Sequence, residues 1–208
     1  MDPTNDLPKP IRRTAIHRRV YDANVYERED GLFDVEVEMR DTKPFAFDNT
    51  DRGYISPGEA LHHMKMRVTL DETLEIRDVE ARTLAGPYHM CGDITQNYKQ
   101  LIGLKITDGF LKKATEITGR TKGCTHHNDM LKVMGTTAFQ GLWTLISHRN
   151  KARAEAAAHR GGKGADLTAP AQKLIGKSAA AALLNTCHAY AEVSPIVKRQ
   201  WPEFYKGD

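Results

Sequence analysis

The sequence predicts an α+β fold, in which an antiparallel β-sheet from the N-terminal half packs against helices from the C-terminal half. Up to about residue 82, apolar residues alternate with polar ones, as they do in strands with one face on a core. After Pro87 the apolar residues recur at the longer spacing of helices. With 208 residues, 40% hydrophobic and 27% charged, the chain is long enough to bury one sizeable core.

The N-terminal segment, residues 1–12, contains three prolines and few apolar residues, which predicts a flexible arm. Residues 13–208 are predicted to form a single α+β domain without internal repeats. Two hairpins come first. In the first, Asp30-Gly31 supplies the turn before an alternating run, and in the second, residues 64–70 alternate up to a polar turn at 71–73 and residues 74–82 return. We therefore expect about four strands, in one sheet with one wet face.

Helices are predicted for the rest of the chain. A short helix precedes Gly103, a second covers residues 110–118, and the strongest begins near Asn128 and continues to about His159. Residues 160–167 are glycine-rich and predict a mobile loop. An alanine-rich helix from Thr168 to about Tyr190 follows, and Ser194-Pro195 starts a last short helix that ends before Pro202.

Strand alternation selects three candidate site residues. Apolar residues of the second hairpin occupy even positions, so His62 is predicted to face inward and His63 outward. In the first hairpin the apolar row of odd positions continues to Asp41 and Lys43, if the strand extends that far. A charge at the end of a core-facing row needs a partner, because an unpaired buried charge costs several kcal/mol. Either a structural ion pair or a site satisfies this requirement.

The stretch Gly123-Cys-Thr-His-His-Asn-Asp-Met130 holds further candidates at the start of the strongest helix. The positive end of the helix dipole favours a thiolate at Cys124, and Asp129 follows His126 at a spacing that places both on one helical face. Cys124 and His126 could ligate a metal ion, or His126 and Asp129 could act as a general base pair. The alternative is a packed cysteine and a capping histidine without function.

Cys91 extends the possible ligand set. It lies at the junction between the sheet and the helices, where loops carry chemistry more often than packed elements do. A set drawn from separated segments could hold zinc or iron: His62, Cys91, Cys124 and His126. Their spacing differs from a paired Cys-x-x-Cys motif, so the sequence also allows these residues to be structural.

Several classes of protein are disfavoured. The chain has no phosphate-binding or dinucleotide-binding glycine motif, so we expect no nucleotide cofactor. Lys and Arg number 30 against 27 Asp and Glu, without a long basic run, so we expect no nucleic acid. No apolar stretch approaches a membrane span or a secretory signal, and the three cysteines lack scaffold-like spacing. These features predict a cytoplasmic protein without membrane contact. We also expect a homodimer, because this is the commonest oligomeric state of soluble enzymes.

Ordered blocks along nearly the whole chain, from about Thr14 to Tyr205, resemble an uncharacterised bacterial family, the domain of unknown function 2889. The blocks include His17-Arg-Arg, Asp41-Thr-Lys43, Pro57-Gly-Glu59 followed by His62-x-Met64, Pro87-Tyr88 with Cys91, Gly123-Cys-Thr-His126, Cys187-His188 and Trp201-Pro. The chain departs from the family pattern at His127 and Asp129, where the family has leucine and glutamate. The resemblance implies a substrate from the breakdown of aromatic compounds.

Two classes of function follow. In the first, the protein is an enzyme that acts on a small molecule, with His126, Asp129, His62, Asp41 and Lys43 in one pocket. A lyase is expected: His126, assisted by Asp129, removes a proton, and Lys43 or a metal stabilises the oxyanion, as in retro-aldol loss of a small aldehyde from a phenolic substrate. Metal-dependent hydrolysis is a further alternative. In the second class, the same residues hold a metal in a scaffold or accessory protein without turnover.

Overall fold

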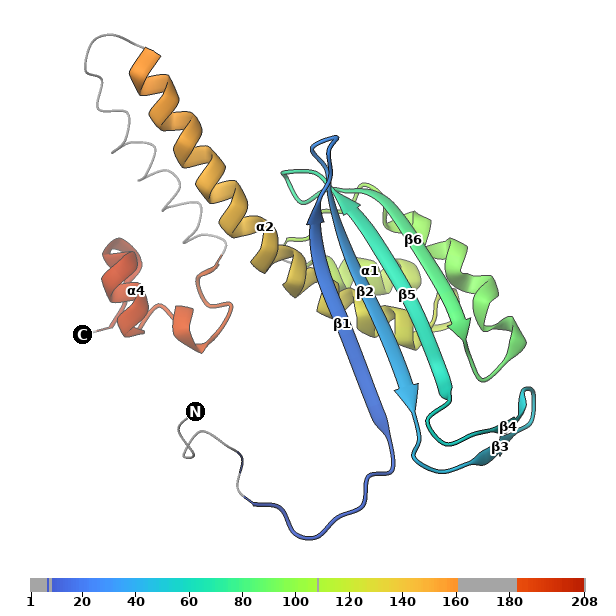
Figure 1. Cartoon of the computed structure of the whole chain (residues 1–208). Helices are drawn as coiled ribbons and strands as arrows, with labels where there is room; N and C mark the ends of the chain where they lie inside the picture. The colour runs from blue at the N-terminus through green and yellow to red at the C-terminus, as the bar shows by residue number, and fades with distance from the viewer. Residues whose placement is uncertain (1–6, 8, 108, 161–182, 208) are drawn as a thin grey trace.

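The computed structural model describes residue 7 and residues 9–107, 109–160 and 183–207. It confirms the α+β prediction, since a four-stranded antiparallel sheet packs against helices that follow it in the chain. The strands are β1 (Arg18–Glu27), β2 (Phe33–Thr42), β5 (Ala60–Leu70) and β6 (Ile76–Ala85), in the order β1-β2-β5-β6. The sheet lies in front of the helices in Figure 1, with β1 at one edge.

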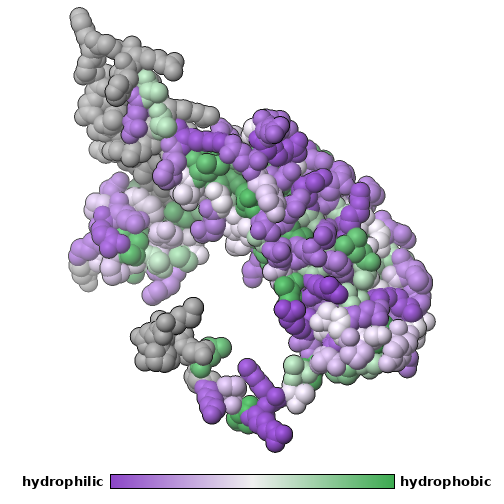
Figure 2. Space-filling view, viewed as in Figure 1, coloured by the Kyte–Doolittle hydropathy of each residue, from purple (hydrophilic) through white to green (hydrophobic). Residues whose placement is uncertain are grey.

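The alternation of β2 gives the sheet two chemically different faces. The odd positions from Phe33 to Asp41 are buried, whereas the even positions from Asp34 to Arg40 are half-buried or exposed. We call the first the helix-side face and the second the outer face. Over the sheet, Figure 2 shows mostly hydrophilic residues on the outer face. One wet face is thus confirmed, and the core lies between the helix-side face and the helices.

A short hairpin of β3 (Phe47–Asn49) and β4 (Gly53–Ile55) was not predicted. Three-residue strands are too short to show alternation, so the sequence carries no periodic signal for them. The hairpin follows the end of β2 and precedes the start of β5, and it lies beyond one end of the sheet in Figure 1.

The helices after β6 largely follow the predictions. η2 (His89–Leu101) is a 3-10 helix, longer than the short helix predicted before Gly103, and η3 (Arg120–Lys122) is a further 3-10 turn. α1 (Phe110–Thr118) has the predicted bounds, and α2 (Thr125–Arg160) begins three residues before the predicted start. The predicted apolar stripe of α2 faces the core. Five of its members are buried, Met130, Leu131, Met134, Ala138 and Leu142, and the last two, Leu145 and Ile146, are partly buried.

The C-terminal segment contains η4 (His188–Tyr190), α4 (Pro195–Gln200) and η5 (Pro202–Phe204). Ser194 caps α4 as predicted, because its Oγ accepts a hydrogen bond from the backbone N–H of Val197 at 3.1 Å. The alanine-rich helix was predicted to reach about Tyr190, and this is wrong. Residues 184–187 form turns and bends, and Asn185 has a left-handed φ of 60° that ends any helix.

Some predictions cannot be compared fully with the structure. The predicted loop at 160–167, apart from Arg160 at the end of α2, and the predicted helix up to residue 182 lie outside the described residues. Residues 7 and 9–12 of the predicted arm are exposed, and the division into an arm and one domain stays a prediction. In the described part of the chain, no helix is both long enough and apolar enough to cross a bilayer.

Candidate functional site

Three neighbouring strands bring charged residues into one row across the helix-side face. Arg19 of β1 is paired with Asp41 of β2, and Asp41 is paired with His62 of β5. Directly paired residues of antiparallel strands project from the same face of a sheet, so the three side chains meet. The row lies next to buried Met39 and Met64, where the apolar rows of β2 and β5 change to polar residues.

Asp41 is the centre of this row. Its side chain is 1% exposed, and the guanidinium of Arg19 donates to both carboxylate oxygens, from Nε to Oδ1 and from Nη2 to Oδ2, each at 2.7 Å. His17 Nε2 lies 3.3 Å from Oδ1, and His62 Nδ1 lies 3.0 Å from Oδ2. Burial alone would raise the pKa of Asp41, but Arg19, His17 and His62 outweigh it and hold the pKa below its usual value. Asp41 is therefore a buried carboxylate that stays ionised.

The first turn of α2 adds His126. Its Nε2 lies 3.9 Å from Asp41 Oδ2, and its ring lies against that of His62, with centroids 3.8 Å apart and planes tilted by 33°. Burial has the largest effect on the pKa of His62 and lowers it, and the positive charge of His126 lowers it further. Together these effects outweigh Asp41, which raises the pKa. Burial and the charge of Arg19 lower the pKa of His126 in the same way. Both imidazoles are therefore neutral at pH 7, with nitrogen lone pairs available.

Asp41, His62 and His126, which we call the Asp–His group, could hold a metal ion. One ligand atom from each residue lies within 4.8 Å of the other two. Two neutral imidazoles and an ionised carboxylate are a donor set that suits zinc or iron. The contact between Arg19 and the carboxylate resembles the outer hydrogen bonds that orient metal ligands. The residues present thus fit a divalent metal.

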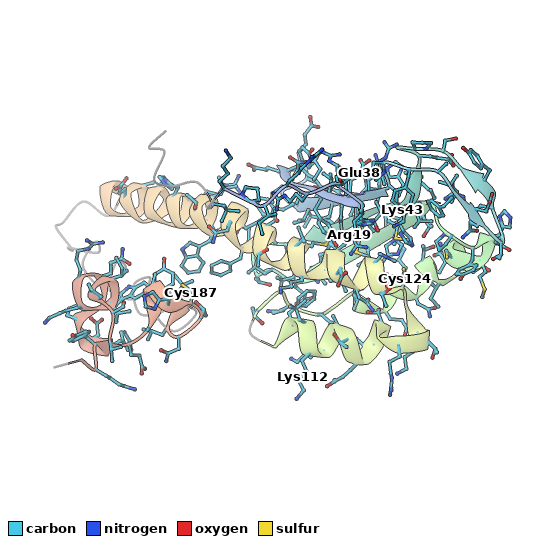
Figure 3. All side chains as sticks on the ribbon, turned by 90° about the horizontal axis from the view of Figure 1, so that it is seen from below. Arg19, Glu38, Lys43, Lys112, Cys124 and Cys187 are labelled. Atoms are coloured by element: carbon cyan, nitrogen blue, oxygen red, sulfur yellow. The ribbon has the colours of Figure 1, made fainter. Side chains whose placement is uncertain are left out.

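The two cysteines of the predicted ligand set are placed differently. Cys124 is half-buried and directly precedes the first residue of α2, and its Sγ lies 3.9 Å from Nδ1 of His126. Cys91 lies beside Gly86 after the end of β6, where a Cβ added at residue 86 would come 3.2 Å from its Sγ. Among the described residues, neither belongs to a group of ligand atoms close enough to share an ion. Cys187 is exposed on the C-terminal segment, well apart from Cys124 in Figure 3.

Two predicted catalytic residues have other neighbours. Asp129 Oδ2 lies 3.4 Å from Arg19 Nη1, and in the described part of the chain no hydrogen bond or ion pair joins Asp129 to His126. The carboxylate that contacts a histidine in this site is that of Asp41. Lys43 lies beyond the end of β2, with its Nζ 5.5 and 5.9 Å from the ring centroids of Phe45 and Phe47. Its role at an oxyanion stays a prediction.

Arg19 and His17 were missed as site residues. The signal for Arg19 was present, because it shares the odd positions of β1 with Tyr21, Ala23 and Val25, which pack against the core. Parity therefore places Arg19 on the same face as Asp41. His17 precedes the first residue of β1, where alternation gives no direction for a side chain.

A polar network fixes the start of α2 and so the position of His126. The hydroxyl of Tyr98 accepts a hydrogen bond from the backbone N–H of Cys124 at 2.9 Å and lies 3.0 Å from Oδ1 of Asn128. Asn128 also accepts from the Thr118 hydroxyl and donates to the Thr118 carbonyl. Tyr98 and Thr118 are fully buried, so this network is held by the core. The network joins η2, the end of α1 and the first turn of α2.

Comparison with known proteins identifies the family to which most of the chain belongs. No curated protein and no solved structure matches the chain. A family model described as "Protein of unknown function (DUF2889)" matches residues 17–140, which is more than half of the 208 residues. The match contains Arg19 and the whole Asp–His group, whereas the blocks at Cys187-His188 and Trp201-Pro lie beyond it. The chain therefore belongs to the DUF2889 family over residues 17–140, a family whose function its description leaves open.

Proposed function

We propose that the protein is a lyase that acts on a small molecule by acid/base chemistry at the Asp–His group. The observation that carries the proposal is the contact of 3.0 Å between the buried, ionised carboxylate of Asp41 and Nδ1 of His62. A carboxylate at Nδ1 favours the tautomer that keeps its proton there, which leaves the Nε2 lone pair to act as a base. In this proposal His62 and Asp41 take the role of base pair that the sequence analysis assigned to His126 and Asp129.

The proposed reaction is a retro-aldol cleavage. His62 takes the proton of a β-hydroxyl group, and the electron pair of the O–H bond becomes the second bond of an aldehyde carbonyl. The carbon–carbon bond breaks, and its electron pair moves into a carbonyl or conjugated ring of the remaining fragment. Protonated His62 then returns the proton to that fragment, so that atoms and charge balance.

The surrounding residues have distinct roles in this scheme. Arg19 is a positioning residue, because its two hydrogen bonds orient the Asp41 carboxylate and keep it charged. His126 lies against His62 and is neutral, so it can donate a hydrogen bond to the substrate oxygen. An aromatic catabolic intermediate is the proposed substrate, on the family resemblance alone. The predicted cytoplasmic location and homodimer stay predictions.

The pH dependence of turnover tests this assignment. Because His62 must be neutral and its pKa is lowered, kcat/KM should rise with pH through an apparent pKa below 6.5. The assay measures aldehyde release from phenolic compounds that carry a β-hydroxyl group. His63→Ala is the matched control, since His63 is the next residue but lies on the outer face against Glu38. His62→Ala should lose the acidic limb of the profile and His63→Ala should keep it; equal profiles would refute the assignment.

A metal-binding function is the second candidate, and the convergence of three ligand atoms within 4.8 Å favours it. A bound zinc or iron ion would supply a Lewis acid for lysis or hydrolysis, or would be purely structural in a scaffold. In either case His62 would be a ligand and could not act as the free base. The two candidates therefore assign different roles to the same imidazole.

Metal titration separates the two candidates. If the second is correct, the protein purified without chelator should contain about one zinc or iron ion per chain. His126→Ala should lower the affinity for added Zn²⁺ by at least tenfold, because it removes one of three ligands. Cys124→Ser should leave the affinity unchanged, because Sγ lies outside the group. Turnover in a chelator-treated protein would favour the acid/base proposal.

A further inference from the structure

Most charged side chains on the outer face of the sheet form ion pairs, either with each other or with Arg28 and Lys99 outside the sheet. Nine charged or titratable side chains of β2, β5 and β6 each have a partner of opposite charge: Asp34, Glu36, Glu38, His63, Lys65, Arg67, Asp78, Glu80 and Arg82. Opposite charges on neighbouring strands stabilise a sheet, so these residues are explained by the fold itself.

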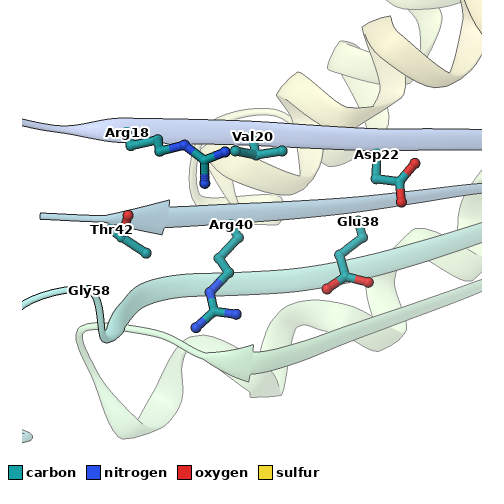
Figure 4. Close-up of a pocket in the computed structure, with 7 residues that line it drawn as sticks. All are labelled: Arg18, Val20, Asp22, Glu38, Arg40, Thr42 and Gly58. Atoms are coloured by element: carbon teal, nitrogen blue, oxygen red, sulfur yellow. The ribbon is translucent and has the colours of Figure 1, made fainter.

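Three charged residues of this face have no ion pair among the described residues: Asp22, which accepts only a hydrogen bond from Asn24, and two arginines. Arg18 of β1 and Arg40 of β2 have no ion pair or side-chain hydrogen bond within the part of the chain that the structure describes. They lie beside the same hollow, of about 440 Å³, whose lining also includes Val20, Thr42 and Gly58 (Figure 4). Two guanidinium groups without ion pairs therefore line the same concave part of the surface.

Two carboxylates also line the hollow, but only that of Asp22 lacks an ion pair, so the two arginines leave the hollow with a net positive charge. Glu38 lies 2.6 Å from Nε2 of His63 and 2.8 Å from Nζ of Lys65, and Asp22 accepts a hydrogen bond from the side chain of Asn24. The register places Arg18 opposite Thr42, and Val20 opposite Arg40, so both guanidinium groups arise from adjacent positions of two paired strands. The Thr42 hydroxyl has no hydrogen-bond partner among the described residues, which leaves a third donor at the hollow.

We propose that this hollow binds a small ligand through an oxyanion, a carboxylate or a phosphate group. A guanidinium group presents parallel N–H donors that match the two oxygens of such a group, and two arginines supply both the charge and the geometry. Val20 contributes an apolar wall beside the charged groups. The ligand is small, because the hollow is bounded by the side chains of two strands and by the turn at Gly58.

The oxyanion hollow is separate from the Asp–His group. Arg18 and Arg19 are consecutive on β1, and Arg40 and Asp41 are consecutive on β2, so the members of each pair project from opposite faces of the sheet. A ligand in the hollow would contact the outer face only. The inference therefore does not rest on the proposed lyase activity.

Calorimetric titration of the full chain with inorganic phosphate and with succinate tests the inference, with chloride as the reference anion at constant ionic strength. We expect phosphate or succinate to bind measurably tighter than chloride, and the tighter of the two identifies the oxyanion class. Arg40→Gln and Arg18→Gln should each weaken binding at least about tenfold, because each removes one charged donor pair. Arg67→Gln is the control, since Arg67 lies on the same face but is paired with Glu36.

Binding no tighter than chloride for both anions would overturn the inference. Equal weakening by Arg40→Gln and Arg67→Gln would overturn it too, because it would indicate attraction by the net charge of the surface and not by the hollow. Circular dichroism of each variant confirms folding before titration. An Arg40→Gln variant that keeps the pH profile of aldehyde release while it loses anion binding would show that the two sites are distinct.

Discussion

Replacement of Asp41 by asparagine is expected to lower aldehyde release by a factor on the order of 10²–10⁴, by analogy with other carboxylates that orient a catalytic histidine. Asparagine keeps the shape of the side chain but removes the charge that holds Nδ1 of His62 and both donors of Arg19. His62 can then adopt the tautomer with its proton on Nε2, which cannot act as a base. The measurement is kcat at saturating substrate and pH 7.5.

The same substitution should destabilise the protein. It removes one partner of an ion pair in which the side chain of Asp41 is 1% exposed and that of Arg19 is 31% exposed. We expect the free energy of unfolding to fall by about 2 kcal/mol, which is less than for a fully buried pair. Glu38→Gln is the matched control: this carboxylate is on the same strand and also contacts a histidine, but on the outer face. It should keep full turnover and lose less than about 1 kcal/mol. Equal effects of the two variants on turnover would rule out the assigned role of Asp41.

The second large effect is expected in the acid stability of the protein and depends on His127. Its side chain is completely buried against Tyr98, Nε2 lies 3.3 Å from the carbonyl oxygen of Arg82, and Nδ1 has no hydrogen-bond partner in the described structure. Burial lowers the pKa of His127 to about 4, from an ordinary value of 6.5. The folded state therefore resists a proton that the unfolded state accepts.

The sign of the effect follows from this difference. Above pH 6.5 both states are neutral and His127 contributes no pH dependence; between pH 6.5 and about 4 the unfolded state binds the proton more tightly, so stability falls as pH falls. A difference of about 2.5 in pKa corresponds to roughly 3 kcal/mol at the acid end. Urea unfolding at a series of pH values measures it.

His127→Leu should remove most of this acid-dependent loss. At pH 7.5 the variant should be within about 1 kcal/mol of the wild type, because it loses one long hydrogen bond but also the unsatisfied Nδ1. His89→Leu is the control, since that side chain is 81% exposed and its loss should leave the pH profile unchanged. If the free energy of unfolding of His127→Leu falls between pH 6.5 and 4 as steeply as that of the wild type, groups other than His127 cause the acid-dependent loss of stability.

Much of the fold was predictable because its signals are local. The alternation of β2 and β5 identifies both strands and their buried faces, and the apolar period identifies α1 with the bounds Phe110–Thr118. The β3–β4 hairpin and the 3-10 character of η2 were not predictable, because short strands and tight helices leave no distinctive period. The end of the alanine-rich helix was predicted wrongly, since alanine favours a helix and the turn at Asn185 lacks a glycine to mark it.

Local sequence patterns indicate which side chains could form the site. For His62 and Asp41 they also indicate the face of the sheet, because strand alternation has a period of two whatever the partner strand. Which of these side chains come into contact depends on strand register and on helix packing. The register of β1, β2 and β5 aligns Arg19, Asp41 and His62 in one row, and the packing of α2 brings His126 to Asp41 while Asp129 contacts Arg19. These contacts join residues far apart in the chain, and they follow from strand pairing and helix packing, which no local pattern encodes.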